Sequence, residues 1–486
     1  MNIVLATSPS EEDKHGVRSM APLSLGYLAA GVKKHPEVTV RIVDAYGEGL
    51  TVNQAYDRVM ALSPDLLGVS STSFCFPSGI RLISRIKSAR SGVVTLMGGY
   101  HPTMFDNLLL KDVPALDLVI RGEGDESFPE LCRRLLRSES IAGAPGLSYR
   151  ANGQVVRGIP QQIEDLNAIP FPARELFTYD GYFHQFGGFP IPEIPRTANV
   201  ASSRGCPYHC TFCPKLFPQW RYRMRSAENV FQEILELHRA GFKMAFFQDE
   251  NFSHDVKRLE TLCRMIIDRR LDMRFAFQGT IHHLPDPVFP LMHEARFDAL
   301  FVGVESGSDE QLARYRKPPR SKSLAHGIRR AKDAHLGVIA FFIHGGPGET
   351  AEDARATQAF IRDVRPHVCG ASELSVQPGA ILWDELTGSV PPETLEASCP
   401  RKIHEYSGQH TAQDIRLRRR AFQKAFGRSW MSLGRIKEGL DLLRHNRTLQ
   451  GIAKDMLLNP KSLLQLIRGG PREKDDPRFS ISRQNH

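Results

Sequence analysis

Near the middle of the chain stands the stretch Arg204-Gly205-Cys206-Pro207-Tyr208-His209-Cys210-Thr211-Phe212-Cys213. Its cysteines follow one another at spacings of four and three residues. Thiolates are soft ligands that select iron–sulfur chemistry, so three of them on one loop can hold three irons of a [4Fe–4S] cluster and leave the fourth iron open. Zinc is less favoured because it takes four ligands, and only His209 stands in the loop as a fourth. A disulfide would leave one of the three thiols unpaired.

The sequence around this stretch is that of an ordinary chain of two or three domains. It has 486 residues, of which 41% are apolar and 24% charged, a length beyond what one hydrophobic core usually supports. The scattered cysteines are expected to be buried free thiols in a reducing cytoplasm. The first residues are typical of a strand, not of a signal peptide, and no apolar run is long enough to predict a transmembrane helix.

The net charge of +9 comes largely from the C-terminal part of the chain. Its basic residues there include Arg416, Arg418, Arg419, Arg420, Lys424 and Arg428. A solvated helix face is the default interpretation of such a run, and peripheral docking to a membrane surface is a further one. Nucleic acid is not expected as a partner. Residues 391–472 are predicted to form a helical region and residues 473–486 a disordered tail.

Residues 1–140 alternate between short apolar runs and helical patterns. Strands are predicted at 3–6, 38–43, 66–69, 93–97 and 118–120, and helices at 23–34, 53–62, 79–89 and 126–136. This alternation predicts an α/β domain with a doubly wound parallel sheet. Ligands of such folds bind beyond the carboxyl ends of the strands.

The residues at those strand ends suit a bulky polar ligand. Glycines there let a ligand come close to the backbone, and hydroxyl groups can hydrogen-bond a polar tail. The candidate binding residues are Asp44, Tyr46, Ser70, Ser71, Thr72, Gly98, Gly99, Gly122 and Glu123. His101 is nearby, and a hydrogen-bonding role is expected for it.

A connector at residues 141–195 separates this domain from a second α/β region. Asn152-Gly153 between apolar runs predicts a hairpin.

Strands of the second region are predicted at 200–203, which delivers the cysteine stretch, and at 244–247, 273–277, 299–303, 338–343 and 374–376. Polar or glycine-rich turns follow three of them and contain Asp249, Glu250, Glu305, Ser306 and Gly346. Each turn taken alone is also compatible with a plain helix N-cap.

The cysteine spacing resembles that of the radical S-adenosylmethionine (SAM) superfamily. The resemblance implies that residues 196–390 form a partial (β/α)6 barrel and that Cys206, Cys210 and Cys213 hold the cluster. It implies that the open iron binds SAM, with Phe212 beside the adenine. Asp249 and Glu250 would then accept hydrogen bonds from the SAM amino group, and Glu305, Ser306 and Gly346 would contact the rest of SAM. Arg314 and Lys317 either pair with the SAM carboxylate or lie on a solvated helix face.

The N-terminal region resembles the cobalamin-binding domain of the cobalamin-dependent radical SAM family. Tyr46 stands where many cobalamin domains have a cobalt-ligating histidine, which implies cobalamin without a lower histidine ligand. The resemblance implies a methyltransferase that acts on an unactivated carbon of a small molecule such as a natural product, lipid or pigment. Electrons would come from a flavodoxin or ferredoxin. A cyclase or rearrangement enzyme without methyl transfer is the alternative, and a redox sensor that uses the cluster as a switch is the third.

Overall fold

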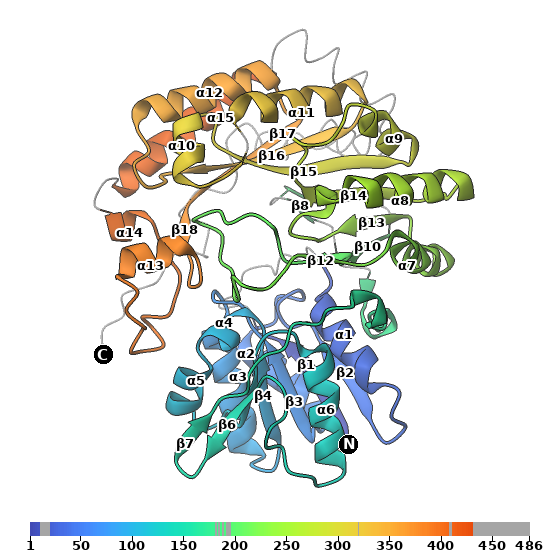
Figure 1. Cartoon of the computed structure of the whole chain (residues 1–486). Helices are drawn as coiled ribbons and strands as arrows, with labels where there is room; N and C mark the ends of the chain where they lie inside the picture. Colours follow the sequence, from blue (N-terminus) through green and yellow to red (C-terminus); the bar gives the residue numbers. More distant parts are fainter. Residues whose placement is uncertain are drawn as a thin grey trace.

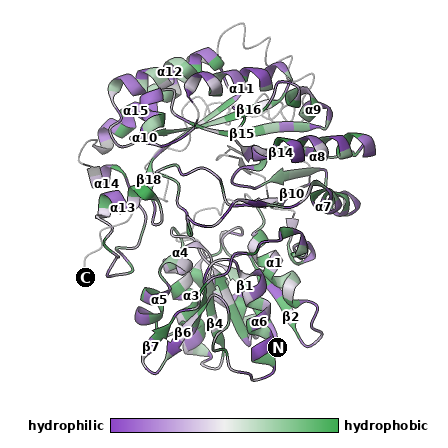
Figure 2. Ribbon diagram, in the orientation of Figure 1, coloured by the Kyte–Doolittle hydropathy of each residue, from purple (hydrophilic) through white to green (hydrophobic). Residues whose placement is uncertain are grey.

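The computed structural model describes residues 1–9, 20–179, 182, 185–186, 189–190, 196–318, 320–407 and 411–430. Two α/β units lie one above the other, with the N-terminal unit at the bottom of Figure 1. Figure 2 shows apolar strands in the interior of each unit and hydrophilic residues on the outer helices. Among the described residues, no helix is both long and apolar enough to cross a membrane.

The N-terminal sheet has the strand order β2-β1-β3-β4-β5-β6-β7. The first five strands in the chain run parallel: β1 (Asn2–Thr7), β2 (Thr39–Val43), β3 (Leu66–Ser70), β4 (Val94–Gly98) and β5 (Leu118–Ile120). This order reverses direction between β1 and β3, and ligands of doubly wound sheets bind at such a switch point. The predicted strands and the predicted parallel sheet are confirmed.

Helices cover both faces of this sheet because the buried strands are apolar on both sides. One core joins the sheet to α1 (Leu23–Val32) and α6 (Gly124–Leu136). The other joins it to α2 (Val52–Ala61), α3 (Phe76–Ala89) and α5 (Asp106–Asp112), while α4 (Tyr100–Met104) directly follows β4. Thr51 and Gln54 form a capping box that begins α2, which satisfies backbone N–H groups that the helix itself leaves unpaired.

The predicted hairpin is present, and it extends this sheet. Its strands are β6 (Leu147–Ala151) and β7 (Gln154–Val156), and β6 pairs antiparallel with β5. Where the structure describes the rest of the connector, it contains the short 3-10 helices Leu166–Ala168 and Arg174–Leu176 and the small hairpin of β8 (Gln185–Phe186) and β9 (Phe189–Pro190).

The second unit is built on six parallel strands in sequential order. They are β10 (Thr197–Val200), β13 (Met244–Phe247), β14 (Arg274–Gly279), β15 (Phe297–Glu305), β16 (Gly337–His344) and β17 (Val368–Glu373). Their helices are α7 (Ala227–Arg239), α8 (Val256–Arg269), α9 (Val288–Glu294), α10 (Asp309–Arg314), α11 (Ser321–Asp333) and α12 (Ala351–Val364). Strand–helix repetition in one rotational order is the pattern of a partial (β/α) barrel, as predicted.

Two predicted strands of this unit are wrong. The strand expected at 200–203 ends at Val200, because the Asp249 carboxylate binds the Ser202 N–H and hydroxyl and turns the chain out of the sheet. The next residues form β11 (Ser203–Arg204), which pairs with β12 (Arg223–Met224). The sixth barrel strand is β17, not 374–376; β17 is only half-buried and lacks a strong apolar pattern. Residues expected in it instead form β18 (Ser375–Val376), which pairs with β19 (Arg401–Lys402).

The C-terminal part of the chain contacts both units. It contains α13 (Ile381–Thr387), α14 (His404–Ser407) and α15 (Ala412–Trp430), and α15 packs along α12. Leu395 and Cys399 pack against a core of the N-terminal sheet. Residues 431–472 of the predicted helical region 391–472 lie outside the described residues, as does all of the predicted tail 473–486.

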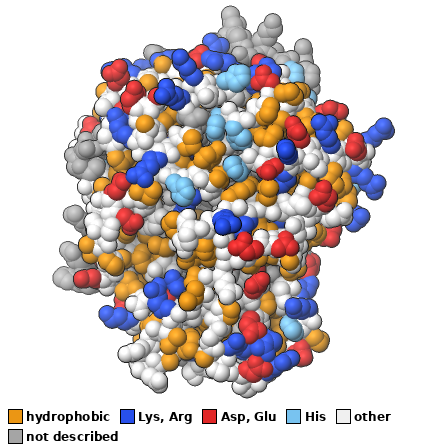
Figure 3. Space-filling view, in the orientation of Figure 1, with side chains coloured by type: hydrophobic (Ala, Val, Ile, Leu, Met, Phe, Trp, Pro, Cys, Tyr) orange, Lys and Arg blue, Asp and Glu red, His pale blue; other side chains and the backbone are white. Residues whose placement is uncertain are grey.

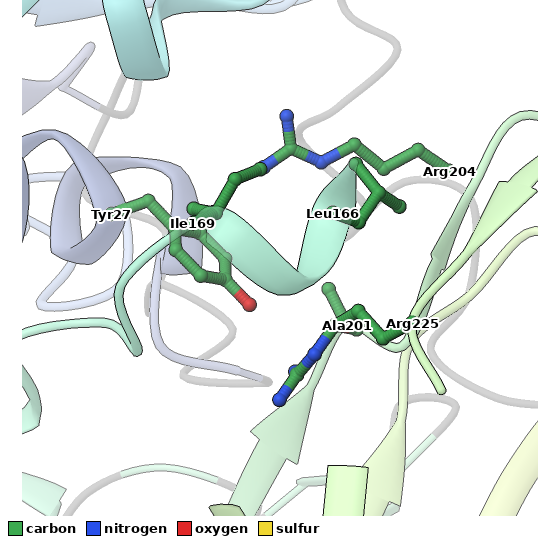
Figure 4. Close-up of a pocket in the computed structure, with 6 residues that line it drawn as sticks. All are labelled: Tyr27, Leu166, Ile169, Ala201, Arg204 and Arg225. Atoms are coloured by element: carbon green, nitrogen blue, oxygen red, sulfur yellow. The ribbon is translucent and has the colours of Figure 1, made fainter. Parts of the chain in front are cut away.

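Buried ion pairs join the two units. Arg223 of β12 donates to both oxygens of Glu123, at 2.9 and 2.7 Å, and Arg204 donates to Asp125 at 2.8 Å. Beside this joint is a cavity of about 10 Å³ (Figure 4), room for roughly one water molecule. Its walls are Tyr27, Leu166, Ile169, Ala201, Arg204 and Arg225. The cavity is too small for a cofactor, so this region is a packed joint.

Candidate active site

The three cysteines lie on the loop that follows β10 and β11. All are free thiols; Cys210 is buried, Cys206 half-buried and Cys213 exposed. Although the Cys213 side chain reaches the surface, the protein packed around its thiol raises its pKa to about 11, and Cys210 and Cys206 contribute further to that rise. Three neighbouring soft donors, one of them exposed, fit a cluster that is held on one side and open on the other.

The loop is fixed at both ends by buried contacts. At its start, Asp249 accepts hydrogen bonds from the Ser202 N–H at 2.9 Å and from the Ser203 hydroxyl. Near its end, the Thr211 N–H donates to the Tyr315 carbonyl at 2.9 Å. Asp249 is only 1% exposed and its oxygens are occupied by the chain itself. This carboxylate therefore anchors the cysteine loop, and the expected contact between Asp249 and SAM stays a prediction.

Glu250, the next residue, lies differently. Its side chain is exposed, yet protein surrounds it closely enough that burial raises its pKa. Backbone N–H groups of Glu250 and Gly205 bind this carboxylate. A carboxylate suits an ammonium group, and the expected contact between Glu250 and the SAM amino group stays a prediction.

Glu305 and Lys317 form a buried pair beside the cysteine loop. Their side chains are 12% and 10% exposed, and the Nζ–Oε1 distance is 3.3 Å. Burial disfavours the charge of Lys317, but Glu305 and the nearby Cys210 outweigh it and raise its pKa. Lys317 thus does not lie on a solvated helix face, one of the two alternatives for it; Arg314 instead pairs with Asp353 at 2.9 Å.

The backbone at Glu305 is strained. Its φ is +65°, and the pairing of β15 with β16 shifts register between Gly303 and Glu305. A left-handed conformation is costly for a residue with a side chain and concentrates at functional sites. The strain turns the Glu305 side chain toward Lys317, at the edge where the cysteine loop also lies.

Two segments expected to contact SAM are held together by α12. Thr357 accepts a hydrogen bond from the Gly307 N–H at 3.0 Å and binds the Ser306 hydroxyl at 3.1 Å. Asp353 binds the Ser308 hydroxyl and completes a capping box with Thr350. Ser306 is 1% exposed, so its hydroxyl holds the segment and leaves only its backbone for a ligand.

The remaining expected SAM residues lie around Tyr315. The ring of Phe212, on the cysteine loop, meets the Tyr315 ring edge-on at a centroid distance of 5.2 Å. Gly346 lies on the other side: a Cβ there would be 2.0 Å from the Tyr315 hydroxyl oxygen. Only glycine fits this approach. The structure thus brings the cysteine loop, the Glu305 segment and the Gly346 turn to one end of the barrel.

The residues expected at the edge of the N-terminal sheet divide into two groups. Tyr46 and Thr72 are exposed, and Ser70 is half-buried at the same edge as Gly98 and Gly99. Close approach to the backbone there requires a residue without a Cβ, since at Gly99, with φ +96°, a Cβ would lie 2.7 Å from the Ser71 carbonyl oxygen.

Four other expected cobalamin residues contact other parts of the protein, and their contact with cobalamin stays a prediction. Asp44 is buried and accepts from Thr7, Gly47 and Tyr182 at 2.8, 3.0 and 2.7 Å. Ser71 is buried and accepts from Ser8 at 2.9 Å. Glu123 holds Arg223, and Gly122 packs against Pro160, Trp220 and Phe217.

His101 is a fully buried structural residue. Its ring stacks on Phe76 at 3.6 Å, and its nitrogens contact the hydroxyls of Ser73 and Ser398 at 3.2 and 3.4 Å. Burial lowers its pKa to about 3, so the ring is neutral. The predicted hydrogen-bonding role is confirmed, and both nitrogens are engaged.

The segment Pro378–Gly379 links the edge of the N-terminal sheet to the end of the cysteine loop. Tyr100, which follows β4, donates to the Pro378 carbonyl at 2.9 Å, and the adjacent Gly379 carbonyl accepts from the Lys215 N–H at 2.9 Å. Burial raises the pKa of Tyr100, and Cys213 raises it further, so this phenol lies near the cysteine. A ligand at the carboxyl end of β4 and a ligand on the cysteine loop would thus be neighbours.

Sequence reasoning missed a group of histidines at the same end of the barrel. The Tyr208 ring lies 6.2 Å from both His254 and His282, and neither histidine has a hydrogen-bond partner at Nδ1 among the described residues. Burial lowers the pKa of His282 to about 4. Several histidine side chains lie on the face of the barrel unit that Figure 3 shows. Their position just after β13 and β14, where barrel enzymes place functional residues, was the available signal.

These histidines do not form a metal site. His283, the third of them, binds the Ser253 carbonyl through Nε2 at 2.9 Å. Within the described ranges, no three His, Cys, Asp or Glu side chains are arranged to hold one metal ion.

Comparison with known proteins agrees with this geometry. Residues 200–361 match the radical SAM superfamily, and residues 18–132 match the B12 binding domain. The chain is 29% identical over 389 residues to an uncharacterized methyltransferase, PH0819, of Pyrococcus horikoshii, covering 79% of this chain and 83% of that protein. It is 27% identical to the anaerobic magnesium-protoporphyrin IX monomethyl ester cyclase of Rubrivivax gelatinosus, covering 76% and 67% of the two chains.

Solved structures share the fold. The radical SAM methyltransferase TsrM from Kitasatospora setae superposes with a TM-score of 0.65 at 17% identity, covering 80% of this chain and 76% of that one. The cobalamin-dependent SAM radical enzyme OxsB gives 0.65 at 16% identity, covering 98% and 82%. The chain therefore belongs to the B12-binding radical SAM enzymes, whose cofactors are a [4Fe–4S] cluster, SAM and cobalamin.

Proposed function

We propose that this enzyme is a methyltransferase that delivers a methyl group from SAM, by way of cobalamin, to an unactivated carbon of a small molecule. The observation that carries the proposal is the contact between the β4 edge and the cysteine loop through Tyr100, Pro378 and Lys215. Methyl transfer of this kind needs both cofactors to face one substrate. The relative from Pyrococcus horikoshii, described as a methyltransferase, gives further support.

Different residues would bind the cluster and SAM. Cys206, Cys210 and Cys213 would hold the cluster. Glu250 would accept hydrogen bonds from the SAM amino group, and the buried Lys317 would pair with its carboxylate. When bound, the cofactors supply the substrate radical and the methyl group, while the protein positions them and excludes water.

The adenosine part of SAM and cobalamin would be held mainly by close packing against aromatic rings and glycine backbone. Phe212 would cover the adenine and the Gly346 turn would pass close beneath SAM. At the sheet edge, Gly98 and Gly99 would admit the corrin ring, with the hydroxyl of Thr72 and the exposed ring of Tyr46 beside it. Because Ser73 and Ser398 engage both ring nitrogens of His101, the histidine that follows β4, cobalamin would be held without that histidine below cobalt.

His282 and His254 would face the substrate. Each presents a ring close to Tyr208 on the cysteine loop. A neutral imidazole with an unpaired nitrogen forms hydrogen bonds with hydroxyl or carbonyl groups without needing a charge. We therefore place an uncharged polar group of the substrate at these rings.

The second candidate is a cyclase or rearrangement enzyme, favoured by the likeness to the cyclase of Rubrivivax gelatinosus. The two are separated by their products. The protein, reconstituted anaerobically with iron, sulfide and hydroxocobalamin, is given SAM and a strong reductant, and the products are followed by mass spectrometry. A methyltransferase yields both 5′-deoxyadenosine and S-adenosylhomocysteine. Formation of 5′-deoxyadenosine without S-adenosylhomocysteine would contradict the proposal and favour the cyclase.

The electron donor proposed is a flavodoxin or ferredoxin of the cytoplasm. Peripheral contact with a membrane, through the basic C-terminal residues, remains part of the proposal for a lipid or pigment substrate. Co-sedimentation with vesicles that contain anionic lipid tests it, and a protein left entirely in the supernatant would remove it.

A further inference from the structure

The C-terminal helix α15 reaches the barrel end that the SAM segments form. Its Phe422 ring packs on Phe342 of β16 at a centroid distance of 5.2 Å, and its Ile415 is buried against Gly345. A Cβ at Gly345 would lie 2.3 Å from the Ile415 side chain. The helix is therefore fitted to the turn that follows β16.

One arginine of this helix enters the turn. Arg418 Nη1 lies 3.0 Å from Glu349 Oε2, and Arg418 Nη2 donates to the Glu349 carbonyl at 3.4 Å. The two side chains are 19% and 5% exposed. Arg418 was expected on a solvated basic face; it is instead the charge partner of a buried carboxylate.

Glu349 in turn shapes the glycine turn. Its Oε2 atom accepts the Gly345 N–H at 2.6 Å, and its own N–H donates to the Gly346 carbonyl at 3.0 Å. Burial raises the pKa of Glu349 and Arg418 opposes this shift. Removing a partner from a buried ion pair leaves an uncompensated charge, which is strongly unfavourable. Without Arg418, the Glu349 carboxylate would no longer be held in the position in which it accepts the Gly345 N–H and closes this turn.

The Gly345–Gly346 turn lies next to the residues that are expected to contact SAM. Gly346 lies against the buried Tyr315 hydroxyl, and Tyr315 contacts Phe212 and the Thr211 N–H of the cysteine loop. The Tyr315 hydroxyl and the Gln311 amide nitrogen are both buried beside Gly346. A shift of the turn would therefore be transmitted to the wall beside the cysteine loop.

We propose that Arg418 is a positioning residue of the SAM site: it holds the Glu349 carboxylate and so fixes the Gly345–Gly346 turn in the shape that receives SAM. The C-terminal helix thereby completes a site that the barrel strands begin. This proposal concerns SAM binding and does not rest on methyl transfer, so it stands or fails separately from the proposed function.

The test measures the dissociation constant for SAM of the full chain loaded with its cluster and cobalamin, by equilibrium dialysis with labelled SAM. Arg418→Ala is expected to weaken SAM binding about tenfold, and Arg418→Lys, which keeps the charge, to recover most of the loss. Arg420→Ala is the matched control, since Arg420 is an exposed arginine of the same helix. It is expected to bind SAM as the unaltered protein does.

A double-mutant cycle separates positioning from a general loss of structure. Glu349→Gln removes the charge that Arg418 holds, so Arg418→Ala in that background is expected to cause little further loss of SAM affinity. Iron content and the far-ultraviolet circular dichroism spectrum are measured for every variant. Unchanged SAM affinity in Arg418→Ala would overturn the proposal, as would fully additive effects of the two substitutions.

Discussion

Glu123 offers a sharp test of how the two units are joined, because the sequence suggested a cobalamin contact and the structure shows an ion pair. Glu123 and Arg223 are 11% and 7% exposed, and Glu123 also accepts the Ile163 N–H at 3.0 Å. Breaking a buried pair by removing one partner costs about 3–5 kcal/mol. Glu123→Gln should therefore lower the stability of the joint by about 3 kcal/mol.

Glu130 supplies the matched control. It also pairs with two arginines, Arg133 and Arg134, but its side chain is 30% exposed and theirs are 31% and 20% exposed. Ion pairs near the surface contribute about 0–1 kcal/mol, so Glu130→Gln should cost less than about 1 kcal/mol. In other respects the two substitutions are chemically identical.

Urea unfolding followed by tryptophan fluorescence measures the difference. Trp220 lies beside Arg223, with its ring 5.9 Å from the guanidinium carbon, and reports on the joint. With a slope of about 3 kcal/mol per molar urea, the midpoint for Glu123→Gln should fall by about 1 M and that for Glu130→Gln by much less. Cobalamin occupancy, read from its absorbance in the absence of urea, should be retained in both. Equal midpoints for the two variants, or loss of cobalamin from a folded Glu123→Gln protein, would refute this account of Glu123.

Three further predictions concern the site itself. Cys213→Ala should abolish the [4Fe–4S] absorbance while cobalamin binding persists, because the cysteine and the sheet edge belong to different units; retention of a full complement of iron would contradict it. Lys317→Met should weaken SAM binding at least tenfold, because it removes the proposed carboxylate partner and leaves Glu305 buried alone; unchanged affinity would exclude that role. His101→Phe should leave cobalamin bound and should flatten the pH dependence of stability. The His101 pKa is lowered from 6.5 to about 3, so the unfolded chain binds the proton more readily, and stability falls by about 1.4 kcal/mol per pH unit as the pH drops between these values. An identical slope for the variant in urea titrations would contradict the buried neutral ring.

The features that could be predicted from sequence are the local ones. The spacing of Cys206, Cys210 and Cys213 depends on one loop, and the apolar runs of β1 to β5 are buried on both faces, so pattern and structure coincide there. Strand β17 was missed because its residues are half-buried, and a half-buried strand lacks the apolar signature on which the prediction relied.

The roles that were missed depend on contacts between distant residues. Asp249 looked like a ligand carboxylate because it follows a strand, but Ser202 and Ser203, far away in sequence, occupy its oxygens. Arg418 looked like part of a solvated face because its partner, Glu349, lies on another element. In both cases only the fold identifies the partner of the charged group.

The cysteine loop and the β4 edge are expected to present their cofactors to one shared space. Electron paramagnetic resonance can test this arrangement on protein that holds cob(II)alamin together with the cluster in its oxidised and then its reduced, paramagnetic state. Reduction of the cluster should speed the relaxation and broaden the signal of cob(II)alamin, and Cys213→Ala should abolish the change. A cob(II)alamin signal that is the same in both states of a fully loaded protein would contradict this arrangement.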